Sequence, residues 1–243
     1  MKIGVRFTAL CAVGLLLAGC ASQPVIPFDK ATASDVKIIG VVTIAMPQQP
    51  SVRLASDIGQ SFGLIGALVD AGMESSRNSD FWKEIDGNKN PPPATFTNDV
   101  IASLQARGFI AQTVAVIRKS DGFLKNYPSA GEAHVDAYLD LTFIGIGYGY
   151  IAAGIADSTP YRPFAYVNCR LVRASDGSVL MQDIVFYNLV NAVGGNVSGV
   201  TLSPDPAYTF KDFDTLKADP AKASEGLNDA LHKTSDAIGD LMH

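Results

Sequence analysis

The sequence predicts an α/β fold, a single domain with a mixed sheet of about five strands and helices packed on that sheet. Three observations support this prediction. Between residues 36 and 117, a strand, two helices and a second strand follow one another, which is the order of a crossover between parallel strands. An Asp-Gly turn at 176–177 joins two alternating apolar runs as a hairpin. An amphipathic helix is predicted near the end of the sequence, over 220–242.

Residues 1–19 have the order of a secretory signal peptide. Basic Lys2 and Arg6 come first, and an apolar run over 7–17 follows. This run is about half as long as the roughly 20 residues that a membrane-spanning helix needs, so it does not predict a transmembrane anchor. We therefore expect residues 1–19 to be removed.

The signal ends in Leu17-Ala18-Gly19-Cys20, which resembles the lipobox of bacterial lipoproteins. In that family the cysteine thiol receives a diacylglyceryl group, the chain is cut before the cysteine, and the new amine is acylated. A thiol suits this reaction because the thiolate is a strong nucleophile. The resemblance implies a lipidated Cys20 and contact with a membrane through its acyl chains. An aspartate at the next position resembles a retention signal for the inner membrane, and Ala21 stands there instead. We therefore expect the outer membrane, with the domain facing the periplasm.

Residues 20–35 are predicted to comprise the lipidated cysteine and a flexible tether, because they contain two prolines, small residues and little periodicity. Fifteen residues at about 3.3 Å each could reach roughly 50 Å from the bilayer. The globular domain is expected to occupy residues 36–243.

The first strand is predicted over 36–46, where a β-branched and almost continuously apolar run is typical of a central strand. Residues 56–77 are predicted to form a helix with Ser56 as its N-cap. Gly63 and Gly66 thin one face of this helix, and small residues allow close helix packing. That face could pack on the sheet of its own domain, or it could contact a membrane or a partner chain.

Residues 78–93 are polar and rich in turn formers, so they are predicted to form a loop. The loop contains the aromatic pair Phe81 and Trp82. An exposed aromatic pair could anchor a protein partner. More often such a pair covers a local apolar cluster.

A second helix is predicted over 97–107, followed by a strand over 109–117. Because two helices separate the two strands, we expect 109–117 to be parallel to 36–46, with a right-handed crossover.

A long strand is predicted over 135–153, where apolar and polar residues alternate. Gly145, Gly147 and Gly149 share one face of its second half. Either a large group packs against that face or the strand bends there.

The hairpin consists of strands predicted over 161–172 and 179–189. The final helix carries an apolar stripe that needs a sheet to cover it. The stripe residues are Leu227, Ala230, Leu231, Thr234, Ile238 and Leu241.

The composition is that of a globular protein, with 47% hydrophobic and 18% charged residues. The net charge of −5 is unfavourable for nucleic acid, whose binding depends on neutralising phosphates. Of the three cysteines, Cys11 leaves with the signal and Cys20 is expected to be lipidated, so no internal disulfide can form. Cys169 lies in an apolar strand and is predicted to be a buried, inert thiol.

No motif for catalysis, a cofactor or a metal stands out in the sequence. A Gly-x-Gly-x-x-Ala pattern begins at Gly147, but no helix that could hold a dinucleotide follows it before Pro160. His134, His232 and His243 do not have the spacing of metal ligands. We therefore expect a protein that is not an enzyme, with no catalytic residues, no cofactor and no metal.

The domain itself resembles a group of envelope lipoproteins that are similar to the amino-terminal domain of the Tol-system periplasmic protein. The group includes the curli secretion-channel lipoprotein and the lipoprotein activators of penicillin-binding proteins. Four sequence features carry the resemblance: the lipobox, the strand 36–46, the run 135–139, and the run 170–180 with its Leu-Val-x-Ala-x-x-Gly-x-Val-Leu shape. The resemblance implies a non-enzymatic role as a scaffold, an activator or part of an export pore. The shared positions belong to the fold, so no functional residue is transferred.

These observations favour a lipid-anchored periplasmic accessory protein that binds a protein partner of the envelope. Cys20 is the lipidation site, and Phe81, Trp82, Gly63 and Gly66 are the candidate partner-binding residues. One alternative is a subunit of an export pore or an oligomeric ring, so a homo-oligomer stays open. A second alternative is an envelope hydrolase with an unrecognised site.

Overall fold

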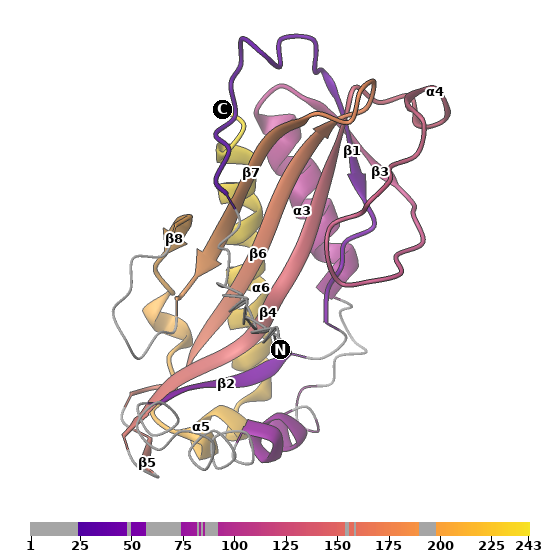
Figure 1. Cartoon of the computed structure of the whole chain (residues 1–243). Coiled ribbons are helices and arrows are strands. Elements are labelled where there is room, and N and C mark those ends of the chain that lie inside the picture. The colour runs from indigo at the N-terminus through magenta and orange to yellow at the C-terminus, as the bar shows by residue number, and fades with distance from the viewer. Residues whose placement is uncertain are drawn as a thin grey trace, which may run out of the picture.

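The computed structural model of the chain describes residues 24–47, 50–56, 74–81, 83, 85, 92–153, 156–157, 159–189 and 198–243. Its strands form one eight-stranded mixed sheet (Figure 1). The strands are β1 (Ile38–Val42), β2 (Ser51–Ser56), β3 (Ile110–Val114), β4 (Ala137–Ala153), β5 (Ala156–Asp157), β6 (Arg162–Arg173), β7 (Val179–Tyr187) and β8 (Val200–Leu202). The helices are α3 (Pro92–Ala106), α4 (Ala130–Ala133), α5 (Phe213–Ala218) and α6 (Pro220–Asp240), with a 3-10 turn η1 (Pro206–Tyr208). Residues 74–81 are also helical.

The strand order is β3-β1-β4-β6-β7-β8, and β2 and β5 also pair with β4. Strand β1 is parallel to both β3 and β4, whereas β6 is antiparallel to β4 and β7. This topology confirms the predicted α/β fold, the parallel pairing of the first strand with 109–117, and the hairpin. The expected number of about five strands was too low. Strands β5 and β8 have only two and three residues, which is too short for a clear periodicity. Strand β2 has six residues and was missed.

Strands β1 and β2 lie end to end along the same edge of β4. The pairing moves from Ile39↔Ala137 in β1 to Ser51↔Gly147 in β2. Gly147 has φ of 152°, and a Cβ atom there would lie 1.7 Å from the carbonyl oxygen of Ser51. The glycine-rich half of β4 therefore admits the backbone of β2, and a β-bulge at Phe143/Gly145 also bends the strand. The bend predicted for the glycine-rich half of the strand is therefore present, and its neighbour at Gly147 is the backbone of a paired strand.

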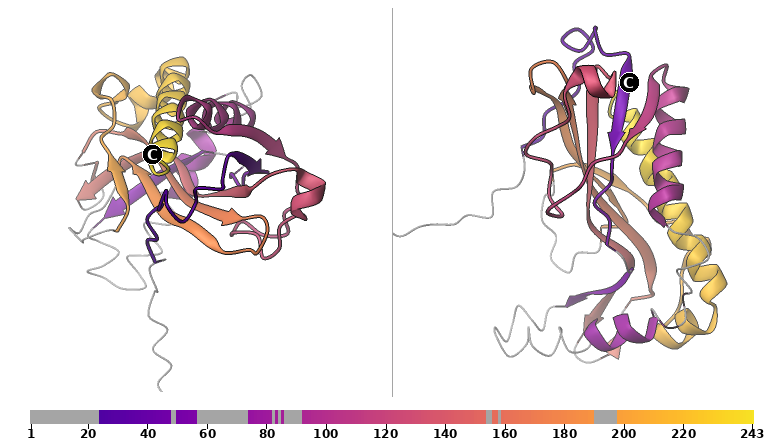
Figure 2. Two further views of the ribbon diagram at one scale, coloured as in Figure 1. Left: turned by 90° about the horizontal axis from the view of Figure 1, so that it is seen from above. Right: turned by 90° about the vertical axis from the view of Figure 1, so that its right-hand side faces the viewer.

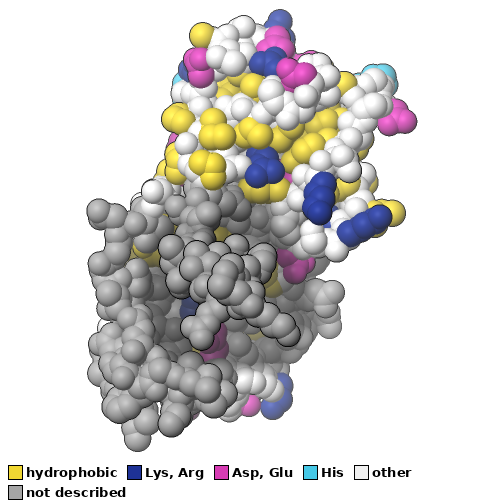
Figure 3. Space-filling model, viewed as in Figure 1, with side chains coloured by type: hydrophobic (Ala, Val, Ile, Leu, Met, Phe, Trp, Pro, Cys, Tyr) yellow, Lys and Arg dark blue, Asp and Glu magenta, His cyan; other side chains and the backbone are white. Residues whose placement is uncertain are grey.

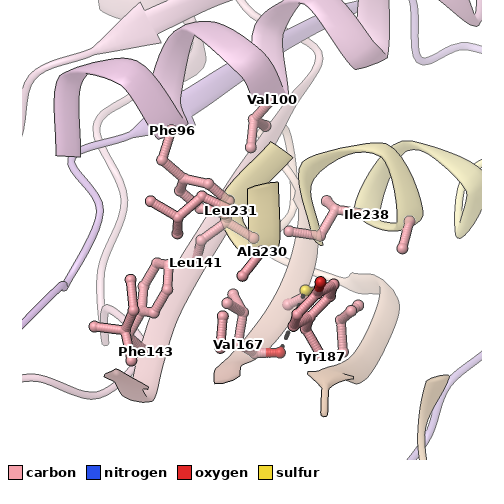
Figure 4. Packing of buried hydrophobic residues seen from close by; sticks show 14 of the residues in the cluster. Phe96, Val100, Leu141, Phe143, Val167, Tyr187, Ala230, Leu231 and Ile238 are labelled. Carbon is pink, nitrogen blue, oxygen red and sulfur yellow. Dashed lines mark hydrogen bonds between the residues drawn. The ribbon is translucent and has the colours of Figure 1, made fainter. Parts of the chain in front are cut away.

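Helices α3 and α6 cover one face of the sheet, here called the rear face, as the right-hand view of Figure 2 shows. Alternate residues of β6 point to it, including Val167 and Cys169, which are fully buried. Figure 4 shows how α3, α6 and the strands meet in this core. Its labelled residues are Phe96, Val100, Leu141, Phe143, Val167, Tyr187, Ala230, Leu231 and Ile238. The predicted stripe of the last helix is confirmed, since Leu227, Leu231 and Ile238 are buried and Leu241 packs at its edge.

Ser56 is the last residue of strand β2, and residues 57–73 of the helix predicted over 56–77 lie outside the described residues. Residues 74–77 are helical as predicted, and the helix continues to 81, into the predicted loop. The predicted start of the next helix was wrong. Helix α3 begins at Pro92, five residues before Thr97. Proline is tolerated in the first helical turn, where its missing N–H group has no partner in any case, so the prolines here do not mark a loop.

The tether predicted over 20–35 was wrong for residues 24–35, which pack on the domain. Ile26 forms an antiparallel bridge with Gln182 of β7, and Ala33 is buried. Asp35 forms an ion pair with Arg173 at the end of β6. Apolar residues spaced between the prolines allow this segment to follow the edge of the sheet.

Candidate functional site

Of the partner-binding residues expected from the sequence, the structure describes Phe81. Phe81 lies in the helix at 74–81 and not in a loop, and its side chain is fully buried against Tyr148, with ring centroids 5.6 Å apart. It is a core residue, so its assignment as an exposed anchor was wrong. Trp82, Gly63, Gly66 and Cys20 lie outside the described residues.

The face of the sheet opposite α3 and α6, here called the front face, contains a buried carboxylate. Asp140 of β4 is fully buried and forms an ion pair with Arg118. Its second oxygen accepts hydrogen bonds from the Leu124 backbone N–H (2.7 Å) and from the Tyr127 hydroxyl (3.0 Å). Burial, and then the charge of Asp140, raise the pKa of Tyr127. Both carboxylate oxygens are bound, so Asp140 fastens the loop before α4 to the sheet and offers no open acid or base.

A second polar group crosses the front face beside this loop. The Arg170 Nε donates to the Gln182 side-chain oxygen (2.7 Å), and the Arg170 guanidinium lies 4.0 Å from the centroid of the Phe123 ring. The Gln182 side-chain N–H group donates in turn to the carbonyl oxygen of Pro24 (2.9 Å). The start of the described chain is thereby connected to the centre of the front face.

An aromatic cluster at the far end of the sheet surrounds an arginine of the same chain. The Arg77 guanidinium lies 4.6 Å from the ring centroid of Tyr150, 5.7 Å from that of Tyr161 and 5.3 Å from that of Phe213. Such contacts bind cations through the negative faces of the rings. Here they hold the helix at 74–81 on the domain, so the cluster is structural.

Tyr187 joins β7 to α6 through a polar network. Its hydroxyl donates to Asp229 (2.8 Å), which forms an ion pair with Lys233 (2.9 Å). Lys233 also contacts Asp205 (3.2 Å). Burial raises the pKa of Tyr187 to about 12, so the phenol stays protonated at neutral pH. The network has alternating charges and closes the junction between the sheet and the helix.

Cysteine and histidine chemistry gives no candidate either. Cys169 is fully buried, and burial raises the pKa of its thiol, as the sequence predicted for an inert residue. His232 is exposed on α6 between Asp99 and Asp236. Across the described ranges, no group of three His, Cys, Asp or Glu side chains could hold a metal ion. None of the helices described there is long and apolar enough to cross a bilayer.

The edge strand β3 is the most exposed apolar element of the described sheet. It is terminal in the strand order, and β1 is its one described strand neighbour. Ile110 N donates to the Lys37 carbonyl oxygen and Thr43 N donates to the Val114 carbonyl oxygen. In a parallel ladder successive residues alternate, so the backbone groups of Thr113 point away from β1.

Some side chains along this edge are widely exposed, whereas Ala111 is buried and Val114 and Val116 are half-buried. The Gln112 side chain donates to the Ala133 carbonyl oxygen (2.9 Å). Ile110 is 61% exposed, and Ile117, three residues beyond the strand, is 92% exposed. Residues 110–117 contain neither a charge nor a proline, which natural edge strands commonly use against strand addition. We call residues 110–117 the edge segment. It is the candidate functional site, because it can accept an extended chain.

Sequence reasoning located this strand but not its role. The uncharged run from 110 to 117 was the available signal, and the sequence predicted only that this strand is parallel to 36–46. Whether a strand is central or terminal depends on distant pairings, in this case the insertion of β4 beside β1.

Comparison with known proteins gives little further information. No family model and no curated protein matches the sequence. Among solved structures, one similar chain is a protein of the DUF330 family from Xanthomonas campestris, with 11% identity, a TM-score of 0.37, and coverage of 85% of this chain and 83% of that chain. Another is a neuraminyllactose-binding hemagglutinin homolog from Helicobacter pylori, with 9% identity, a TM-score of 0.33, and coverage of 86% and 87%. At these scores neither likeness carries an argument.

Proposed function

We propose that this protein is a lipid-anchored, non-catalytic accessory protein of the bacterial envelope that binds a protein partner in the periplasm. The lipobox ending in Cys20 supports the anchor, with the outer membrane as its location. The observation that carries partner binding is the edge segment, with its outward backbone groups and exposed isoleucines. An extended segment of the partner would add there as a further strand, with main-chain hydrogen bonds giving affinity and side-chain contacts giving specificity.

The anchor is tested by Cys20→Ser. The variant should accumulate as unprocessed precursor, because serine cannot supply the thiolate that receives the diacylglyceryl group. Metabolic labelling with a fatty-acid analogue checks this result. A Cys20→Ser protein that is still labelled and still fractionates with outer membranes would contradict the proposal.

The edge segment is tested by photo-crosslinking in intact cells. A photoreactive amino acid at position 117 should give one dominant adduct with an envelope protein, whereas the same residue at the exposed position 228 of α6 should not. Ile117→Lys should reduce co-purification of that partner several-fold, because a lysine opposes strand addition. Asn228→Lys is the matched control.

Two variants at Thr113 distinguish binding by strand addition from binding by side-chain contacts alone. Thr113→Pro removes an outward N–H group without removing a bond to β1, and it should weaken partner binding, while Thr113→Ala should not. Equal binding by the two variants would exclude strand addition. An adduct with the mass of two copies of this chain would instead support the alternative of an oligomeric ring.

A further inference from the structure

The described chain begins at the edge of β7, where it is fixed to Gln182 beside the front face of the sheet. Ile26 N donates to the Gln182 carbonyl oxygen (2.7 Å), and Gln182 N donates back to the Ile26 carbonyl oxygen (2.9 Å). The Gln182 side chain also holds the Pro24 carbonyl oxygen (2.9 Å). In Figure 2 this end of the chain lies on the side of the sheet away from α3 and α6. Residues from Pro24 onward are therefore held on β7.

Only three residues separate Pro24 from Cys20 in the sequence. Four Cα–Cα steps of at most about 3.6 Å place the two Cα atoms within roughly 15 Å of each other, whatever path the chain takes. A bilayer that holds acyl chains on Cys20 must therefore come close to Pro24. This distance is much shorter than the roughly 50 Å that a free tether over 20–35 would allow.

The surface around this point is apolar. Ile144, the bulge residue of β4, is 45% exposed, and Val179 at the start of β7 is 38% exposed. Ile184 of β7 and Phe123 are half-buried nearby, and Arg170 lies over the Phe123 ring. Figure 3 shows apolar side chains across the upper part of this face, with basic side chains among them. We call Phe123, Ile144, Arg170, Val179 and Ile184 the front patch.

We infer that the front patch rests on the lipid surface into which the acyl chains of Cys20 insert. This inference depends on the lipid anchor proposed above. The short connection supplies the argument for lipid as the occupant, because it confines the front face to the neighbourhood of the bilayer. Because the anchor holds the front patch next to the bilayer, the effective concentration of lipid at the patch is high. Weak apolar contacts are then sufficient to keep the patch on the membrane surface. The isoleucines would contact the interface, and Arg170 would meet lipid phosphates.

This arrangement leaves the other surfaces available. Helices α3 and α6 would face the periplasm on the opposite side of the sheet. The edge segment lies at the lateral edge of the sheet, so a partner could reach it along the membrane surface.

The test measures depth with lipid quenchers. The acylated full-length mature protein carries an environment-sensitive fluorophore at Ile144→Cys or, as a second front position, at Val179→Cys. Asn228→Cys on α6 is the matched rear position. Cys169 is fully buried and does not compete for the label. The proteins are reconstituted in vesicles of phosphatidylethanolamine and phosphatidylglycerol that contain a headgroup spin-labelled lipid.

Both front positions should be quenched several-fold more strongly than position 228. Equal quenching at front and rear, in protein that floats with the vesicles, would overturn the orientation and leave the anchor intact. Protein that is neither acylated nor floated would overturn the anchor, and the orientation with it. A flexible Gly/Ser linker inserted after Ser22 should keep flotation and reduce quenching at both front positions, because it removes the confinement.

Discussion

The two faces of the sheet are closed in different ways. The rear face is covered by α3 and α6, and its core consists almost entirely of apolar side chains such as Leu141 and Leu231. The front face is closed by loops and by a polar network around Asp140, with exposed isoleucine beside it. The difference teaches that a sheet closed by helices on one face and by loops on the other keeps its largest apolar cluster on the helical face and exposes apolar side chains on the loop face. The helices cover the rear face continuously, whereas the hydrogen-bonded loops leave apolar side chains of the front face exposed.

The largest effect should come from exposing the rear face. Removal of 220–243 uncovers several large side chains, each worth roughly 1.5–3 kcal/mol when buried. This loss is comparable to the total stability of a typical domain, about 5–15 kcal/mol. The truncated protein should aggregate or be degraded, as judged by size-exclusion chromatography and thermal melting. Removal of the exposed His243 alone should change nothing. A monomeric truncation with an unchanged cooperative melt would show that α6 is an appendage.

Breaking the front network should have the next largest effect. Asp140→Ala removes the carboxylate that pairs with Arg118 Nη2 and that accepts from the Leu124 N–H group and the Tyr127 hydroxyl. Loss of one partner of a buried ion pair costs about 3–5 kcal/mol. Chemical denaturation should show this decrease, while Asp121→Ala at an exposed position of the same loop should stay within about 0.5 kcal/mol. A small effect at Asp140 would mean that the front loop contributes little to folding.

The hairpin turn at Gly177 packs on neither face of the sheet, so a substitution there should change the free energy of unfolding less than the two changes above. Gly177 in the hairpin has φ of 74°, a conformation that β-branched residues resist. Gly177→Val should lower the free energy of unfolding by roughly 1–2 kcal/mol, whereas Gly177→Asn should be close to neutral. Equal unfolding midpoints for the two variants would contradict the turn geometry.

Acid should produce the smallest and most dispersed effect. Backbone N–H groups of Ser178 and Thr215 lower the pKa of Asp176 and Asp212 below their usual values. A carboxyl whose pKa is lowered in the folded state stabilises the protein above the unfolded pKa, and this contribution is lost as pH falls through the folded pKa. The Tm should therefore decrease below about pH 4. The double variant Asp176→Asn with Asp212→Asn should show a shallower decrease, because the asparagine side-chain oxygen can accept the same backbone hydrogen bonds but does not titrate. An identical pH profile would show that these carboxyls do not contribute.

The sequence alone was sufficient for features that depend on local order. The β-branched run at 36–46, the turn at Gly177 and the apolar stripe with Leu231 each set a periodicity or a backbone conformation within a few residues. The parallel pairing of 36–46 with 109–117 also followed, because the helices between them require a crossover. The lipobox that ends in Cys20 is also a pattern of a few neighbouring residues, and it predicts the lipid anchor.

Only the tertiary structure decided which surfaces are open. The burial of Phe81 depends on Tyr148, 67 positions later in the sequence. The docking of residues 24–35 depends on Gln182 and Arg173, and the edge position of β3 depends on the insertion of β4 beside β1. These contacts join segments that are far apart in the chain, so no local pattern contains them. Tertiary pairing therefore placed an expected tether on the domain, and it placed a strand of unspecified position at the edge of the sheet.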